Sequence, residues 1–261
     1  MVYTPDLSST SPESNQAWWR DWFNETYLDV YAHRDQESAA FEVQRAVEWL
    51  SLDAGSRVLD LCCGSGRHCH ALADAGLQQV TGLDYSLPLL QHAKAGGSQA
   101  GFIRGDMRLI PIQTDSVDAV LSFFTSFGYF HEHIENLSVL NEMFRVLRPR
   151  SRFLIDYLNP AYVRAHLQPE SERNQDGVII REFRQLSSDG QRIEKEIVIE
   201  NADKPPQRFY ESVRLYSRRE MTEMLASVNL EPQQIAGSFS GEPFDATSPR
   251  MLITGQRNDS A

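Results

Sequence analysis

Apolar residues recur along the chain with two different periods, which predict different structures. Up to about residue 160, short apolar runs alternate with segments in which large apolar residues recur every three or four positions. The runs predict buried strands, and the recurring positions predict amphipathic helices. Strands that alternate with helices favour a parallel sheet joined by right-handed crossovers.

The predicted elements of this first part follow one another closely. Helices are predicted at 16–31, 41–50, 66–75, 87–95 and 132–147, and strands at 57–61, 79–83, 101–104, 117–122 and 152–157. The first helix carries a stripe of aromatic residues, namely Trp18, Trp19, Trp22, Phe23, Tyr27 and Tyr31. Residues 1–14 are rich in Ser, Thr and Pro and lack periodicity, so we interpret them as a loose leader.

After Asn159-Pro160 the apolar period shortens to two. This alternation predicts antiparallel hairpin strands at 178–185, 191–200 and 208–216. A helix is predicted at 217–229, where Ser217 and Glu220 have the spacing of a capping box. Two last apolar segments are predicted to complete the sheet, at 231–236 and 251–254.

Composition narrows the class of protein. The 261 residues include 41% hydrophobic residues, and 25 Lys plus Arg against 36 Asp plus Glu give a net charge of -11. So acidic a surface repels a phosphate backbone, which makes nucleic acid a disfavoured partner. No stretch approaches the roughly 20 apolar residues that span a bilayer, and the first residues lack a signal-peptide pattern. We therefore expect no membrane association and a cytoplasmic location.

The three cysteines, Cys62, Cys63 and Cys69, lie close together with two histidines beside them. A metal site is therefore an alternative to consider. Consecutive residues of a strand point to opposite faces, however, and no second cluster with zinc-type spacing occurs in the chain. We predict neither a metal nor a disulfide framework.

The most informative stretch runs from Val58 to His68, where a strand turns through Gly64 and Gly66 into a helix. Such a turn brings bare backbone and the amide groups of a helix N-terminus against a ligand. Asp84 ends the next strand, where its carboxylate can accept hydrogen bonds from two ribose hydroxyls. A dinucleotide-binding dehydrogenase needs a third small residue where Cys69 stands, and it does not require the second carboxylate of Gly105-Asp106-Met107.

These motifs resemble, in order and spacing, those of the class I S-adenosylmethionine-dependent methyltransferases. The matching segments are 58–68, Gly82-Leu83-Asp84-Tyr85-Ser86, Gly105-Asp106-Met107, Asp118-Ala119-Val120 and Val146-Leu147-Arg148-Pro149. The segment Thr125-Ser126-Phe127-Gly128-Tyr129-Phe130 is similar to a branch with an antiparallel insertion before the last helix. Arg150-Ser151 depart from the pattern, because the family usually has Gly-Gly there.

The resemblance implies an α/β fold, with a Rossmann-like, mostly parallel seven-stranded sheet and helices on both faces. An N-terminal helical lid and an antiparallel β insertion are added to it. We expect a single domain over 1–261, made of the lid (1–50), a cofactor-binding core (51–160), the β insertion (161–216) and the C-terminal part of the core (217–261).

The resemblance also implies S-adenosylmethionine as cofactor, with S-adenosylhomocysteine as product. Gly64 and Gly66 would pack on it, Asp60 would order the loop near its amino group, and Asp84 would hold its ribose. The remaining implied contacts are Asp106 and Met107 at the adenine, Ser122 and Phe123 at the methionyl part, Arg67 or His68 at the tail, and Cys62, Tyr85, Tyr27 and Tyr31 around it. Alternatively, Asp60 only caps the turn, Met107 belongs to the core, His68 starts a helix, and the aromatic stripe only packs on the domain.

Methyl transfer from a sulfonium is an in-line displacement that needs alignment more than a base. If the acceptor must lose a proton, His131, His133 and Tyr27 are the candidate catalytic residues; the alternative is that both histidines start a helix at the surface. We expect a small-molecule acceptor, with Phe127, Tyr129, Tyr210 and Arg214, and beside them Tyr216, as candidate contacts. The insertion can equally form a dimer contact, so both a monomer and a homodimer remain open.

Three rival functions share these motifs. The first binds the cofactor but performs a cyclisation or isomerisation without methyl transfer. The second is a binding module without catalysis, which the presence of the whole motif set disfavours. The third is an RNA methyltransferase, which the acidic composition and the lack of a Lys/Arg cluster disfavour.

Overall fold

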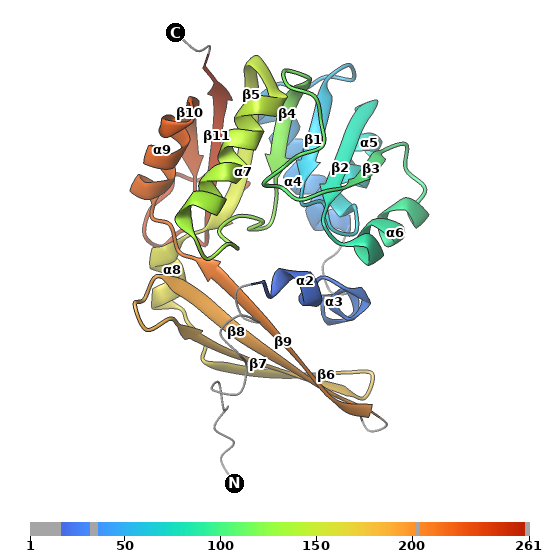
Figure 1. Cartoon of the computed structure of the whole chain (residues 1–261), viewed down its shortest axis with the longest axis vertical. Coiled ribbons are helices and arrows are strands. Elements are labelled where there is room, and N and C mark those ends of the chain that lie inside the picture. Colours follow the sequence, from blue (N-terminus) through green and yellow to red (C-terminus); the bar gives the residue numbers. More distant parts are fainter. Residues whose placement is uncertain (1–16, 32–35, 202–203, 259–261) are drawn as a thin grey trace.

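Two separate β-sheets organise the protein. The computed structural model describes residues 17–31, 36–201 and 204–258, so the predicted leader lies outside the described residues. The larger sheet has seven strands in the order β10-β11-β5-β4-β1-β2-β3, and the smaller has four in the order β6-β7-β8-β9. Helices α2 and α3 lie between the two sheets (Figure 1). The predicted α/β fold with an antiparallel addition is therefore confirmed.

The bounds of the elements agree with most of the predicted ranges. The larger sheet contains β1 (Arg57–Leu61), β2 (Gln79–Asp84), β3 (Gly101–Arg104), β4 (Val117–Ser122), β5 (Leu147–Leu158), β10 (Leu230–Ala236) and β11 (Arg250–Arg257). The main helices are α4 (Gln36–Leu50), α5 (Arg67–Asp74), α6 (Leu87–Ala95), α7 (His133–Val146) and α9 (Arg218–Ser227). The capping box of Ser217 and Glu220 is confirmed at the start of α9.

Strand register brings the carboxyl ends of five strands to one edge of the larger sheet. β1 pairs in parallel with β2 and β4, β2 with β3, and β4 with β5. Only β11 runs antiparallel to its neighbours, between β5 and β10. In parallel sheets of this kind, ligands bind beyond the carboxyl ends of the strands.

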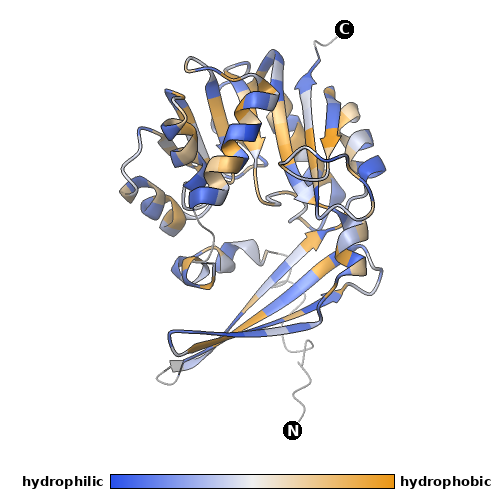
Figure 2. Ribbon diagram, turned by 180° about the vertical axis from the view of Figure 1, so that it is seen from behind, coloured by the Kyte–Doolittle hydropathy of each residue, from blue (hydrophilic) through white to orange (hydrophobic). Residues whose placement is uncertain are grey.

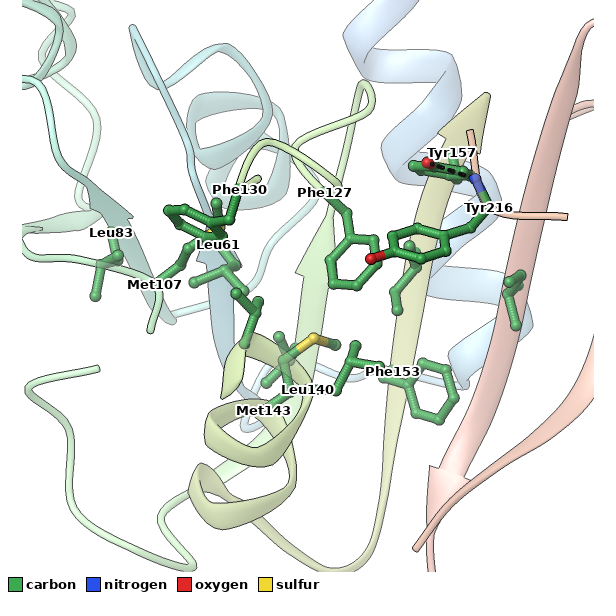
Figure 3. Close-up of a cluster of buried hydrophobic side chains, with 14 of the residues drawn as sticks. Leu61, Leu83, Met107, Phe127, Phe130, Leu140, Met143, Phe153, Tyr157 and Tyr216 are labelled. Atoms are coloured by element: carbon green, nitrogen blue, oxygen red, sulfur yellow. Dashed lines mark hydrogen bonds between the residues drawn. The ribbon is translucent and has the colours of Figure 1, made fainter. Parts of the chain in front are cut away.

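Each face of the larger sheet has its own core, because neighbouring strand residues point to opposite sides. Val58 and Leu121 pack with the buried faces of α4 and α5. Leu59 and Val120 pack with α7 and α9, in the cluster that Figure 3 shows in close-up. Figure 2 shows hydrophobic residues concentrated on the strands of this sheet, while the helices mix both kinds. Within the described ranges, no helix has the length and apolar composition required to cross a membrane.

The single N-terminal helix predicted at 16–31 is wrong. The segment forms two short helices, α2 (Trp19–Trp22) and α3 (Glu25–Val30). Asn24 breaks the helix because its side chain accepts a hydrogen bond from the Thr26 amide and donates one to the Asp21 carbonyl. Asn side chains compete for backbone groups in this way and favour caps over helix interiors.

The insertion has one more strand than predicted. Its sheet contains β6 (Glu170–Gln175), β7 (Val178–Leu186), β8 (Arg192–Asn201) and β9 (Lys204–Arg214). β6 has the sequence ESERNQ, which holds no apolar residue and so gives no signal of alternation. The short helix α8 (Pro160–Ala165) was also missed, although Asn159 as N-cap and Pro160 in the first turn are start signals.

Arg150 occupies a position that the resembling family usually fills with glycine. Its φ of 64° lies in the left-handed region, where glycine is normally preferred. It sits inside β5, which begins at Leu147, five residues earlier than predicted. The departure from the family pattern therefore places a residue with a side chain in a conformation that glycine adopts more readily.

Gly66, the N-cap of α5, cannot carry a side chain without moving its neighbours. Its φ is +79°, and an added Cβ would lie 2.8 Å from the Ala93 Cβ and 3.1 Å from Phe102. Gly97 has a similar φ of +76°, but an added Cβ there would meet nothing within 4 Å. A substitution at Gly97 would therefore cause backbone strain alone, whereas one at Gly66 would cause the same strain and also overpacking.

We expect Gly66→Ala to lower the free energy of unfolding by about 1–3 kcal/mol more than Gly97→Ala, because overpacking adds to a backbone strain that both variants share. Urea denaturation of both variants measures this difference. Equal losses of stability would show that α5 and α6 move apart at little cost.

Candidate functional site

A cavity of about 820 Å³ lies at the carboxyl ends of β1 to β4 and extends under α2 and α3. Its volume is in the upper part of the range of about 300–1,000 Å³ that is typical of small-molecule sites. The turns after the first four strands supply one side of its wall. The residues of these turns in the wall are Cys62 to Ser65, Asp84 and Tyr85, Gly105 to Met107, and Phe123 and Phe124.

Most of the predicted site residues line this cavity. Those in the wall are Tyr27, Tyr31, Cys62, Gly64, Arg67, His68, Asp84, Tyr85, Asp106, Met107, Phe123 and Tyr129. Those outside the wall are Asp60, Gly66, Ser122, Phe127, His131, His133, Tyr210, Arg214 and Tyr216. The structure thus gathers the groups from the first three motifs and leaves out most of the predicted acceptor contacts.

The Asp84 carboxylate connects the turn after β1 to the end of β2. One oxygen accepts the Gly64 amide at 2.8 Å, and the other accepts the Ser86 amide at 2.8 Å. Burial raises the pKa of Asp84 to about 6, although these backbone hydrogen bonds act in the opposite direction. Because a carboxylate can accept about four hydrogen bonds, Asp84 retains acceptor capacity at the cavity wall beside these backbone amides.

Gly64 allows a ligand to reach the backbone. Its φ is +54°, and an added Cβ would have only the Leu89 side chain nearby, at 3.9 Å. Leu89 also lines the cavity, so the space over Gly64 belongs to the cavity. Gly66, by contrast, faces α6 and Phe102, and its predicted contact with a cofactor is replaced by a packing role.

Asp60 lies behind the cavity wall. It is almost completely buried, and its carboxylate accepts the thiol hydrogen of Cys69 at 3.2 Å. Burial raises the pKa of Asp60. The side chain therefore ties β1 to the first turn of α5 and does not face a ligand. Ser122 is likewise buried at the end of β4, outside the wall.

Asp106 forms an ion pair with Arg108 that the sequence did not predict. Arg108 donates to both of its oxygens and also lies 2.5 Å from Glu135. Burial would raise the pKa of Asp106, but the hydrogen bonds from Arg108 outweigh it and hold that pKa below its usual value. The Arg108 guanidinium stacks 4.3 Å from the centre of the Phe130 ring, which lines the cavity.

Cys62 and Met107 place two sulfur atoms in the wall, 3.4 Å apart. Burial raises the pKa of Cys62 well above its usual value, so the group stays a neutral thiol. Met107 is nearly buried and also belongs to the core, so it has both of the roles that the sequence left open. Among the described residues, no three His, Cys, Asp or Glu side chains are arranged to hold a metal ion.

Phe123 and Phe124, consecutive residues after β4, are fixed by two separate polar contacts. Phe123 stacks on His68 at 4.0 Å, and His68 Nε2 lies 2.6 Å from Glu42 Oε2. The amide of Phe124 donates to the buried Asp156 carboxylate at 2.8 Å, and Arg250 on β11 pairs with that same carboxylate. Phe124 and Thr125 both have positive φ, 55° and 60°. Strained backbone of this kind clusters at functional sites.

The N-terminal aromatic residues both pack and line the cavity. The centre of the Tyr27 ring lies 5.1 Å from that of Phe23 and 4.8 Å from that of Tyr31. All three residues belong to the cavity wall. Trp22 is fully buried against Phe209 of the smaller sheet. The sequence allowed two roles for these aromatic residues, covering the site as a lid or packing on the domain. In the structure, α2 and α3 do both.

The smaller sheet holds these helices with polar contacts. Glu211 on β9 accepts from Trp22 Nε1 at 2.6 Å and from the Tyr31 hydroxyl at 3.0 Å. Lys195 on β8 lies 2.7 Å from the other oxygen of Glu211. Arg173 on β6 donates to the Val30 carbonyl at 2.6 Å. The insertion thus shapes the cavity indirectly, through α2 and α3.

The predicted catalytic histidines do not reach the cavity. His131 is exposed beside Glu132, and the Nδ1 of His133 lies 3.3 Å from the Tyr216 hydroxyl. The chain turns outward here because Arg192 and Asn136 hold the Phe130 carbonyl inside, and α7 then begins at His133. Both histidines occupy the surface start of a helix, as the alternative interpretation had it.

Most of the predicted acceptor contacts lie outside the cavity wall. Phe127 is buried in the core against Tyr216, as Figure 3 shows. Tyr210 is hydrogen-bonded to Glu194 on the smaller sheet, and Arg214 lies over Tyr216 and near Glu220. Only Tyr129 lines the cavity. The motif pattern could not separate Phe127 from Tyr129, because Gly128, with a φ of +85°, reverses the direction of the chain between them.

Comparison with known proteins finds a similarity to a protein family in the central part of the chain. Residues 58–150 match the model of a family described as a methyltransferase domain. A demethylmenaquinone methyltransferase from Renibacterium salmoninarum is 36% identical over 109 residues, which cover 41% of this chain and 44% of that protein. The chain spans about half the length of the curated relatives of this kind.

Two further similarities extend over nearly the whole chain. The cypemycin N-terminal methyltransferase from a Streptomyces species is 29% identical over 220 residues, covering 81% of this chain and 88% of that one. The solved structure of an amino pentose methyltransferase from Micromonospora echinaspora, with S-adenosylmethionine bound, has a TM-score of 0.68 and 18% identity. It covers 90% of this chain and 97% of its own.

The raised pKa of Asp84 predicts a pH-dependent stability. The folded protein binds the Asp84 proton more tightly than the unfolded chain, so this group stabilises the fold at low pH and loses that contribution as the pH rises through about 6. Relative to Asp84→Asn, the wild type should lose about 2 kcal/mol of unfolding free energy between pH 4.5 and 7.5. Urea denaturation at both pH values checks this, and parallel curves for the two proteins would contradict it.

Proposed function

We propose that this chain, whose residues 58–150 form a methyltransferase domain of the class I S-adenosylmethionine-dependent family, transfers a methyl group from S-adenosylmethionine to a small-molecule acceptor. One observation supports this most strongly. The glycine turn after β1 and the carboxylates after β2 and β3 line a single cavity. A parallel sheet that gathers these groups at its carboxyl edge has the architecture of a nucleoside site.

The residues present fit this cofactor. The open space over Gly64 admits a ligand against bare backbone, and Asp84 keeps acceptor capacity for two ribose hydroxyls. Asp106 and Met107 would frame the adenine, while His68, Arg67 and Phe123 would surround the methionyl part. Asp60 and Gly66 would act indirectly, by fixing the turn from behind.

When bound, S-adenosylmethionine supplies a methyl group already activated by a sulfonium sulfur. The protein then has two tasks, which are to align the acceptor with that methyl group and to exclude water. Phe123 and Phe124 are held rigidly after β4, and Tyr27 and Tyr31 close the opposite side of the cavity. A dedicated base is not required for these tasks.

The enclosed cavity and the similarities support a small molecule as acceptor. The names of the relatives specify a demethylmenaquinone, an N-terminus and an amino pentose as acceptors of those proteins. The net charge of -11 disfavours RNA, and we propose that nucleic acid is not a partner. We further propose a single-domain protein that acts in the cytoplasm as a monomer or a homodimer, with α2 and α3 serving as the lid. The helix α4, which the sequence had included in the lid, packs on one face of the larger sheet instead.

Calorimetric titration tests the cofactor assignment. S-adenosylmethionine and S-adenosylhomocysteine should bind with micromolar dissociation constants, and NAD should not bind. Asp84→Asn should weaken both by about 10- to 100-fold, since an amide cannot accept from the two ribose hydroxyls and the two backbone amides together.

Asp118→Asn serves as the matched control. Asp118 lies near the start of β4, where it accepts from the Arg57 amide and pairs with Arg148, away from the cavity. This variant should bind both compounds like the wild type. Binding of NAD alone, or of none of the three compounds, would refute the methyltransferase assignment. Binding without any release of S-adenosylhomocysteine across a broad acceptor screen would favour the cyclase or isomerase alternative.

A further inference from the structure

We infer that the methyl acceptor is an amine, which the cavity binds as a positively charged ammonium ion. This inference rests on the proposed function and adds the chemical class of the acceptor. Two independent features of the cavity carry it, namely the aromatic character of one end and the charges along the wall.

The aromatic end of the cavity consists of Phe23, Tyr27, Tyr31 and Tyr129, whose rings contact one another. The rings of Phe23 and Tyr129 are stacked at 5.8 Å with 29° between their planes, and Tyr27 meets Phe23 edge to face. These residues come from the lid helices and from the segment after β4. Electron-rich ring faces attract organic cations, which is how proteins recognise alkylated ammonium groups.

The charges of the wall have the sign that a cation requires. Among the described residues, four aspartates line the cavity, Asp29, Asp74, Asp84 and Asp106, whereas Arg67 is the only lysine or arginine in the wall. The charge of Asp106 is compensated by Arg108, so Asp29, Asp74 and Asp84 give the wall its negative sign. The proposed partners of Asp84, the ribose hydroxyls, are uncharged, so its negative charge persists when the cofactor is bound. Lys195 lies 5.1 Å from the centre of the Tyr31 ring and contacts its hydroxyl, and Glu211 compensates its charge. The ring faces left to a ligand cation are therefore mainly those of Phe23, Tyr27 and Tyr129.

The proton-accepting groups at the aromatic end also favour an amine over an alcohol. Burial, with Tyr27, Cys62 and Glu211 nearby, raises the pKa of Tyr129 well above its usual value, and burial does the same for Cys62. Both groups therefore stay protonated and cannot deprotonate a hydroxyl. The imidazoles of His131 and His133 lie outside the wall. Of the three histidines in the wall, His68, His70 and His92, His68 is engaged by Glu42 and His70 by Ser98. An alcohol needs a base during transfer, while an amine needs only to lose the proton of its ammonium form beforehand.

The transfer step balances without a further reactant. The ammonium ion first releases one proton to water, near the exposed carboxylate of Asp29 at the mouth of the aromatic end. The nitrogen lone pair then forms the new bond to the methyl carbon while the carbon–sulfur bond breaks, and its electron pair stays on sulfur. The products are an N-methylammonium ion and S-adenosylhomocysteine. The positive charge thus moves from sulfur to nitrogen within the same aromatic surroundings.

A pair of probes with the same shape and different charge tests the inference. Choline and 3,3-dimethyl-1-butanol differ in that a quaternary nitrogen replaces a quaternary carbon. The protein saturated with S-adenosylhomocysteine is titrated with each probe in a calorimeter. We expect choline to bind about tenfold more tightly, because the neutral alcohol fills the same space without the cation–ring attraction.

Substitutions locate the probe. Tyr27→Leu and Tyr129→Leu should each reduce choline binding by about threefold or more, whereas Tyr27→Phe keeps a ring and should preserve most of it. Tyr162→Leu is the matched control, since Tyr162 stacks on His166 in α8 and is not part of the wall. It should leave binding of both probes unchanged.

The outcomes separate this inference from the function on which it rests. If S-adenosylhomocysteine itself does not bind, the proposed function fails. If it binds, and the two probes then bind equally or neither binds, the function stands and the amine acceptor is refuted. Preferential binding of choline that persists in both leucine variants would also refute it, because the cation would then lie elsewhere.

Discussion

The burial of one carboxylate determines the geometry on which the rest of the site depends. Asp84 accepts amides from the turn after β1 and from the start of α6, and so it holds together two backbone segments that belong to different strands. Burying the Asp84 carboxylate costs free energy, because burial disfavours the charged form. This cost raises the pKa of Asp84 to about 6. A buried group that is kept at such a cost in the absence of a nearby cation is typical of functional sites. The glycine turn, the cavity and the proposed ribose contact all depend on this arrangement.

The two sheets contribute to the cavity in different ways. The larger sheet supplies the turns that form the floor of the cavity, and the smaller one contributes no residue to the described wall. It acts through Glu211 and Arg173, which fix the positions of α2 and α3 above the cavity. Substitutions in the smaller sheet would therefore alter selectivity for the proposed acceptor indirectly, by moving α2 and α3. This differs from the direct contacts that the sequence suggested for Tyr210 and Arg214.

The parts predicted correctly are those with a local signal in the sequence. Buried strands show as apolar runs, and Gly64, Asp84 and Asp106 stand at strand ends, which a parallel sheet must bring to one edge. The failures have long-range causes. Asn24 ends a helix through hydrogen bonds that overrule the aromatic period, and β6 forms from polar residues because β7 provides a partner. Arg108 and Phe130 enter the site through contacts with each other, which no spacing along the chain predicts.

The segment after β4 depends on a residue that follows it by more than a hundred positions. Phe124 and Thr125 have left-handed backbone, and the Asp156 carboxylate that accepts the Phe124 amide is balanced by Arg250 on β11. Without Arg250, Asp156 would be a buried charge lacking a cation, which a folded protein tolerates poorly. During synthesis on the ribosome, the first four strands emerge long before this arginine does. This side of the cavity wall therefore takes its shape only after the last strand of the larger sheet has been made.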